Sequence, residues 1–195
     1  MKQRYLATQA LRLFLIVLGS LFTVVLSACS GGSAQNPQTN LTIVHIDASW
    51  HTHYASVKDA KRDPEINLII AGTVTALKPS QKQGPLVTTE AIFTITRVAW
   101  NPHNLSVGST LAVNALGGTI GNVVYQVDDF PMYQVGEHEI LFLHFDSATG
   151  KAETLGGPSG RLRVQNGIVK PLNDQGMTVP SNIDENTFLA SILSA

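Results

Sequence analysis

The chain has 195 residues, of which 44% are hydrophobic, so it is long enough for one domain with a substantial core. It carries 13 basic and 14 acidic residues and a formal net charge of −1. This balance argues against nucleic acid as a partner, because that partner requires a basic surface. The sequence contains no complete catalytic motif, and we therefore expect neither enzymatic activity nor a bound cofactor.

A basic N-terminus followed by an apolar run opens the chain. Three basic residues and no acidic residue precede Cys29, and residues 13–26 are almost wholly apolar. An apolar run of this length is typical of a secretory signal peptide, whereas a membrane-spanning helix needs about 20 apolar residues. We therefore expect residues 1–28 to be a signal peptide rather than a permanent membrane span.

The residues that end this run, Leu26-Ser27-Ala28-Cys29, resemble a lipobox, the processing site of bacterial lipoprotein precursors. The resemblance implies cleavage between Ala28 and Cys29 and attachment of acyl chains to Cys29, the only cysteine of the chain. Two or three acyl chains hold a protein stably at a membrane, whereas one chain is marginal. We therefore expect the membrane to be a partner through the lipid on Cys29. The mature protein would be extracytoplasmic, anchored to the cell membrane or to an outer membrane.

The remainder of the chain divides into a tether and one domain. Residues 29–40 are small and polar and include a proline, which predicts a flexible tether. Residues 41–195 predict a single β-rich extracytoplasmic domain, in which β-branched and aromatic residues concentrate in short segments. The predicted strands are residues 41–46, 68–77, 87–100, 110–115, 119–127, 139–145, 161–165 and 168–171. The segment 139–145 is apolar on both faces, as a central strand would be, and Asn166-Gly167 is a strong hairpin signal.

Two short helices complete the predicted elements. Residues 55–62 predict one or two helical turns, and residues 184–193 place Phe188, Leu189 and Leu193 at helical spacing. Many short strands joined by Gly- and Pro-rich turns favour a mainly β fold with a short N-terminal helix and a C-terminal helix. A small antiparallel barrel of the OB type is the first choice, because the strands are long and glycines lie within or beside them. A β-sandwich is the alternative.

Three pieces of the domain follow a recognisable order: LIIAGTV over residues 68–74, VGE running into LFL over residues 135–143, and GGPSGRLRV over residues 156–164. They resemble a group of secreted bacterial domains with a VxGTV strand, an xVGExxLLFL strand and a GGPQGxFxV hairpin. This sequence departs from the pattern at Ser159, where glutamine is usual, and at Leu162, which replaces an aromatic residue. The resemblance implies one extracellular β-rich unit and no particular activity.

A cluster of polar side chains follows the first predicted strand. His45, Asp47, His51 and His53 include three of the six histidines of the chain. His51 and His53 on an extended segment would point to one side, and His45 or Asp47 would supply the third ligand of an open zinc-type site. The alternative interpretation is a solvated segment near the tether whose histidines are incidental.

These features predict a lipid-anchored cell-envelope protein whose barrel-like domain binds an unidentified protein or small-molecule ligand or has a structural role. A metal-binding protein or metal-dependent enzyme that uses His45, His51 and His53 is one alternative. A protease-inhibitor-like interaction module is another, by analogy with secreted OB-like domains that use an exposed N-terminal edge. A metal site requires three ligands within bonding distance, whereas an interaction module requires an exposed apolar or aromatic patch.

Overall fold

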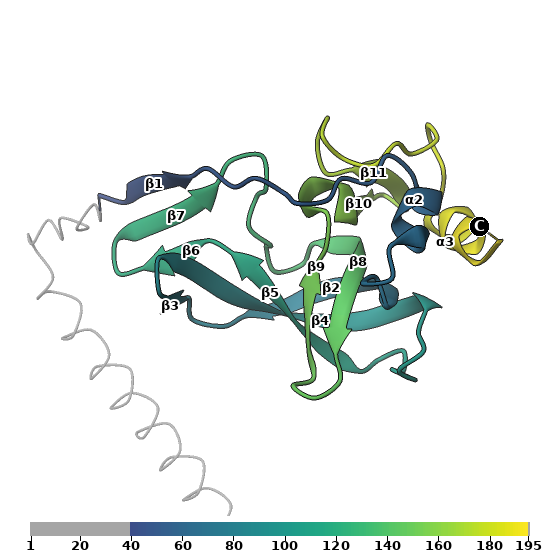
Figure 1. The fold of residues 1–195 in the computed structure, drawn as a ribbon, viewed down its shortest axis with the longest axis horizontal. Coiled ribbons are helices and arrows are strands. Elements are labelled where there is room, and N and C mark those ends of the chain that lie inside the picture. Colours follow the sequence, from purple (N-terminus) through teal and green to yellow (C-terminus); the bar gives the residue numbers. More distant parts are fainter. Residues whose placement is uncertain (1–39, 195) are drawn as a thin grey trace, which may run out of the picture. The chain divides into compact units, whose positions relative to one another are not determined.

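A computed structural model describes residues 40–194, which form a mainly β unit (Figure 1). The strands are β1 (Thr42–Ile46), β2 (Leu68–Leu77), β3 (Gln81–Gln83), β4 (Leu86–Trp100), β5 (Thr110–Leu116), β6 (Gly118–Ile120), β7 (Val123–Val127), β8 (His138–Asp146), β9 (Lys151–Thr154), β10 (Arg161–Gln165) and β11 (Ile168–Pro171). The helices are α2 (Val57–Arg62), a 3₁₀ turn over Gly157–Gly160, and α3 (Glu185–Ser194). The predicted signal peptide, cleavage site and lipidated Cys29 lie outside the described residues, as does the predicted tether except for its last residue. Within residues 40–194 the helices are too short or too polar to span a membrane.

Five strands close into a barrel in the order β8, β2, β4, β5, β9 and back to β8. Four of the five pairings are antiparallel, and the pairing of β5 with β9 is parallel. Strands β10 and β11 extend the sheet as a hairpin on the outer side of β8. A five-stranded closed barrel with a C-terminal helix confirms the predicted small barrel of the OB type.

The barrel closes because β2 and β4 are long and bend strongly. β4 runs for 15 residues, and its pairing with β2 shifts register three times. One shift falls between Ala71 and Gly72, where a side-chain carbon on Gly72 would lie 3.0 Å from the Thr94 carbonyl oxygen. Bulges and glycines of this kind increase the local twist of a sheet, which lets five strands form a closed surface.

The domain has two apolar cores, one on each face of the sheet that contains β8. Leu141 and Leu143 point into the barrel, where they contact the inward side chains of β2, β4 and β5. Ile140 and Phe142 point the other way and pack beneath α2 and α3, together with Phe188 and Ile192. Because both faces are covered, the prediction that 139–145 is a central strand is confirmed.

The two predicted helices and the predicted hairpin turn are confirmed. The Ser56 side chain accepts a hydrogen bond from the Asp59 backbone amide at the start of α2, and Asp184 accepts one from the Thr187 amide at the start of α3. Both are the N-cap contacts that favour helix initiation. Asn166 and Gly167 have φ values of 53° and 76°, as a tight hairpin turn requires.

Four details differ from the predictions. Residues 119–127 form two strands rather than one, because Gly121 has a φ of 60° and turns the chain between β6 and β7. The short strands β3 and β9 were not predicted. In α3 the buried third residue is Ile192, whereas Leu193 is 69% exposed.

Candidate binding groove

A polar groove crosses the outer face of the barrel over β4, β5 and β9. Inward residues of these strands are buried and, apart from Thr89, apolar, so the alternate residues face outward. The strand registers pair Glu90 with Asn114 and Asn114 with Glu153. Three adjacent strands therefore each contribute one polar side chain to a single row.

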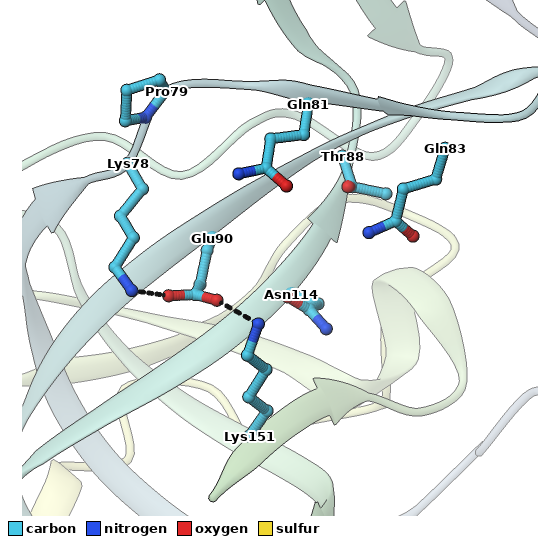
Figure 2. Close-up of a pocket in the computed structure, with 8 residues that line it drawn as sticks. All are labelled: Lys78, Pro79, Gln81, Gln83, Thr88, Glu90, Asn114 and Lys151. Carbon is cyan, nitrogen blue, oxygen red and sulfur yellow. Dashed lines mark ion pairs between the residues drawn. The ribbon is translucent and has the colours of Figure 1, made fainter. Parts of the chain in front are cut away.

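Glu90 lies at the centre of a charge cluster in this groove (Figure 2). Its carboxylate forms ion pairs with Lys78, which precedes β3, and with Lys151 at the start of β9, the second at 2.7 Å. Hydrogen bonds from Lys151 and Lys78 lower the pKa of the Glu90 carboxyl. The Glu90 side chain is only 12% exposed, whereas both lysine side chains are at least half exposed. The lysines thus neutralise a nearly buried carboxylate and present their remaining N–H donors to solvent.

The groove consists of three adjoining hollows that all include Asn114. The first measures about 170 Å³ and is lined by Gln81, Gln83 and Thr88 beside the charge cluster. Its neighbours measure about 360 and 300 Å³, and both include Glu153. Pockets for compact small molecules are predominantly apolar and deeper. A row of open hollows that is polar beside the charge cluster and more apolar at its other end instead fits a ligand that is long and bound along the surface.

An aromatic wall closes one end of the groove. Trp50 lines the last hollow beside Phe130, and the two ring centroids are 4.6 Å apart. The Gly157–Gly160 turn packs against Trp50, while the Ser159 hydroxyl accepts a hydrogen bond from the Tyr54 amide and donates one to the Gly156 carbonyl. Ser159 is fully buried. The GGPSG motif therefore positions the segment that carries Trp50.

A buried ion pair lies beside Phe130. Arg161 donates two hydrogen bonds to the Glu139 carboxylate at 2.9 and 2.8 Å and one to the Pro131 carbonyl at 2.7 Å. Its guanidinium also stacks over the Tyr133 ring at 3.8 Å. Arg161 and Glu139 are both completely buried. Since no solvent or ligand reaches this pair, we interpret it as part of the scaffold that supports the groove.

The predicted metal ligands are not brought together. His45 lies on β1, and its Nδ1 is hydrogen-bonded to the Asp128 carboxylate at 2.7 Å. His51 and His53 are exposed on the connection from β1 to α2, on either side of Thr52. Among residues 40–194 no group of three His, Cys, Asp or Glu side chains is placed to hold a metal ion. The reason is local: β1 directs His45 toward Asp128, and packing of Trp50 and Tyr54 on the barrel fixes the course of the segment between them.

The charge cluster makes a testable contribution to stability. Because its folded-state pKa is lowered, Glu90 stabilises the fold above its unfolded-state pKa of about 4.3, and this contribution is lost as the pH falls through the folded-state value. We expect Glu90→Gln to lower the free energy of unfolding by about 1 kcal/mol at neutral pH, since both lysines are solvent-exposed. The difference in unfolding free energy between the two proteins should narrow as the pH falls below the unfolded-state value. Urea unfolding of both proteins from neutral to acidic pH checks the expectation. A difference in unfolding free energy that does not change with pH would contradict it.

Comparison with known proteins assigns neither a family nor a function to the chain. The chain matches no protein-family model, and no curated protein matches its sequence. The resemblances to lipoprotein precursors and to secreted β-rich domains therefore stay predictions.

Proposed function

We propose that this protein is a lipid-anchored component of the cell envelope that binds a glycan chain in the groove across β4, β5 and β9. The observation that carries the proposal is the row of Glu90, Asn114 and Glu153 on three adjacent strands, with Trp50 at one end. Carboxylates and amides hydrogen-bond well to sugar hydroxyls, which both donate and accept. An indole ring offers a flat apolar surface for one face of a sugar.

The charges of the groove favour an uncharged polymer over a polyanion. Both of its lysines, Lys78 and Lys151, already pair with Glu90. Glu153 and Asp146 add two further negative charges to the lining. A phosphate backbone would meet no free cationic row here, and such a row supplies most of the affinity for nucleic acid.

The fold supports the same site by analogy. OB barrels commonly bind oligosaccharides or oligonucleotides on the face of their second and third strands, which correspond to β4 and β5. The predicted anchor on Cys29 adds a further argument. Tethering a weak binding domain to the envelope raises its effective concentration beside the envelope polymers.

Calorimetric titration of the detergent-solubilised full-length protein tests the binding site. We expect chitotetraose, an uncharged oligosaccharide with amide groups, to bind, and tetragalacturonic acid to bind much more weakly. Asn114→Ala should weaken the affinity for chitotetraose about fivefold to tenfold, because the central hydrogen bonds of the row are lost.

The matched control is Asn186→Ala, which removes an exposed amide from α3, outside the groove, and should leave the affinity unchanged. Binding that is equal in the Asn114→Ala and Asn186→Ala proteins would place the site elsewhere. Failure of both oligosaccharides to bind would contradict the proposed ligand class.

A further inference from the structure

The strands β1, β7 and β6 form a three-stranded sheet of their own, which we term the arm. β1 pairs in parallel with β7 and has no partner strand on its other side in residues 40–194. Figure 1 shows β1 on the outer side of β7, away from the barrel strands. No residue of β1 belongs to either apolar core. The outer edge of the arm is therefore held by pairing with β7 rather than by burial.

The arm exposes apolar side chains and carries no formal charge. Leu41 is 58% exposed and Ile43 is 55% exposed, and Val44, on the opposite face of β1, is also exposed. Residues 40–46 and 111–127 contain no Asp, Glu, Lys or Arg. An uncharged edge strand with exposed apolar residues on both faces is unfavourable in water and is normally covered or charged.

The position of the arm in the sequence indicates which surface covers it. Only 12 residues separate Cys29 from Thr42, the first residue of β1. Even a fully extended chain of this length spans at most about 40 Å. If Cys29 carries the lipid, the arm is thus the first part of the domain after the anchor and lies within reach of the bilayer.

We propose that the arm dips edge-first into the headgroup region of the membrane, with Leu41, Ile43 and Val44 in contact with lipid. This inference rests on the lipid anchor of the proposed function and is independent of the glycan groove. At the headgroup level apolar side chains reach the acyl boundary, while the free backbone groups of β1 stay hydrated. The half-buried Tyr125 of β7, paired with Val44, is a residue type enriched at this level.

Tryptophan quenching by brominated lipid tests the proposal. Acylated full-length protein carrying Ile43→Trp is reconstituted into vesicles of phosphatidylethanolamine and phosphatidylglycerol with brominated acyl chains, and the signal of the parent protein is subtracted. The matched control is Val107→Trp, at an equally exposed apolar position in the loop between β4 and β5. We expect quenching of the arm tryptophan at least twice that of the control. Val44→Trp gives the same readout should Ile43→Trp not fold.

The possible outcomes test the arm proposal and the lipid anchor separately. Equal quenching of both tryptophans in acylated protein overturns the proposal and leaves the anchor intact. Absence of quenching together with dimer formation also overturns it and identifies the edge of β1 as a protein interface. A mass spectrum with an unmodified Cys29 removes the anchor and, with it, the arm proposal.

Discussion

Replacing Arg161 by methionine is expected to lower the free energy of unfolding by about 3–5 kcal/mol, because the buried Glu139 carboxylate then loses both guanidinium hydrogen bonds and keeps only a weaker contact with Arg163 at 3.9 Å. Both side chains are 0% exposed, and Arg161 provides two hydrogen bonds to the Glu139 carboxylate. The substitution also removes the hydrogen bond to the Pro131 carbonyl. Urea unfolding followed by far-UV circular dichroism measures the loss.

Two companion variants distinguish charge burial from a general effect of removing arginine. Arg163→Met removes a partly exposed guanidinium that pairs with Glu137 at 3.2 Å and lies 3.9 Å from Glu139. Because Glu139 keeps both hydrogen bonds from Arg161, this variant should cost about 1 kcal/mol or less. Adding Glu139→Leu to Arg161→Met removes the orphaned charge and should recover part of the loss. If Arg161→Met were no more harmful than Arg163→Met, the pair would not be stabilised as described.

This ion pair connects parts of the chain that the barrel alone does not join. Arg161 opens β10, Glu139 lies on β8, and Pro131 belongs to the connection from β7 to β8. That connection also carries Phe130 and Tyr133, whose rings lie 4.8 and 3.8 Å from the Arg161 guanidinium. Burial raises the pKa of Tyr133 to about 12, so its hydroxyl stays neutral and shares a hydrogen bond with Thr154. One arginine thus orients the aromatic wall at the end of the groove.

The barrel strands were largely predictable because β-branched and other apolar residues concentrate in short segments that turn residues separate. The segments 68–77 and 139–145 correspond closely to β2 and β8. β9 was missed because Lys151–Thr154 is short and mostly polar, and it is a strand only through pairing with β5 and β8. Such pairing depends on contacts distant in sequence, which local patterns do not encode.

The candidate site was much less predictable than the fold. Glu90, Asn114 and Glu153 lie far apart in the sequence and meet only through strand register. Arg161 was overlooked because arginine is normally exposed, and nothing local marks it as buried. The metal site was predicted because His45, His51 and His53 are close together in the sequence. In the structure His45 contacts Asp128 instead, and the three side chains do not meet. Alternation on 87–91 does place Thr88 and Glu90 on the outer face, and this was the one available signal for the groove.

The contact between Gly157 and Trp50 provides the second large expected effect. Gly157 has a φ of 51°, and a side-chain carbon at this position would overlap the Trp50 ring. We expect Gly157→Ala to lower the free energy of unfolding by about 3 kcal/mol, through backbone strain and through overpacking against the indole. Because the Trp50 ring must shift from its present position beside Phe130, the affinity for chitotetraose should fall as well.

Gly150→Ala is the matched control for this effect. Gly150 has a φ of 70°, but no atom lies within 4 Å of the position that its side-chain carbon would occupy. The control therefore carries the backbone strain alone, about 1 kcal/mol, and should leave binding unchanged. The difference between the two variants, measured by urea unfolding and by calorimetric titration, isolates the Trp50 contact. Equal losses of stability with unchanged binding would mean that the GGPSG turn does not position Trp50.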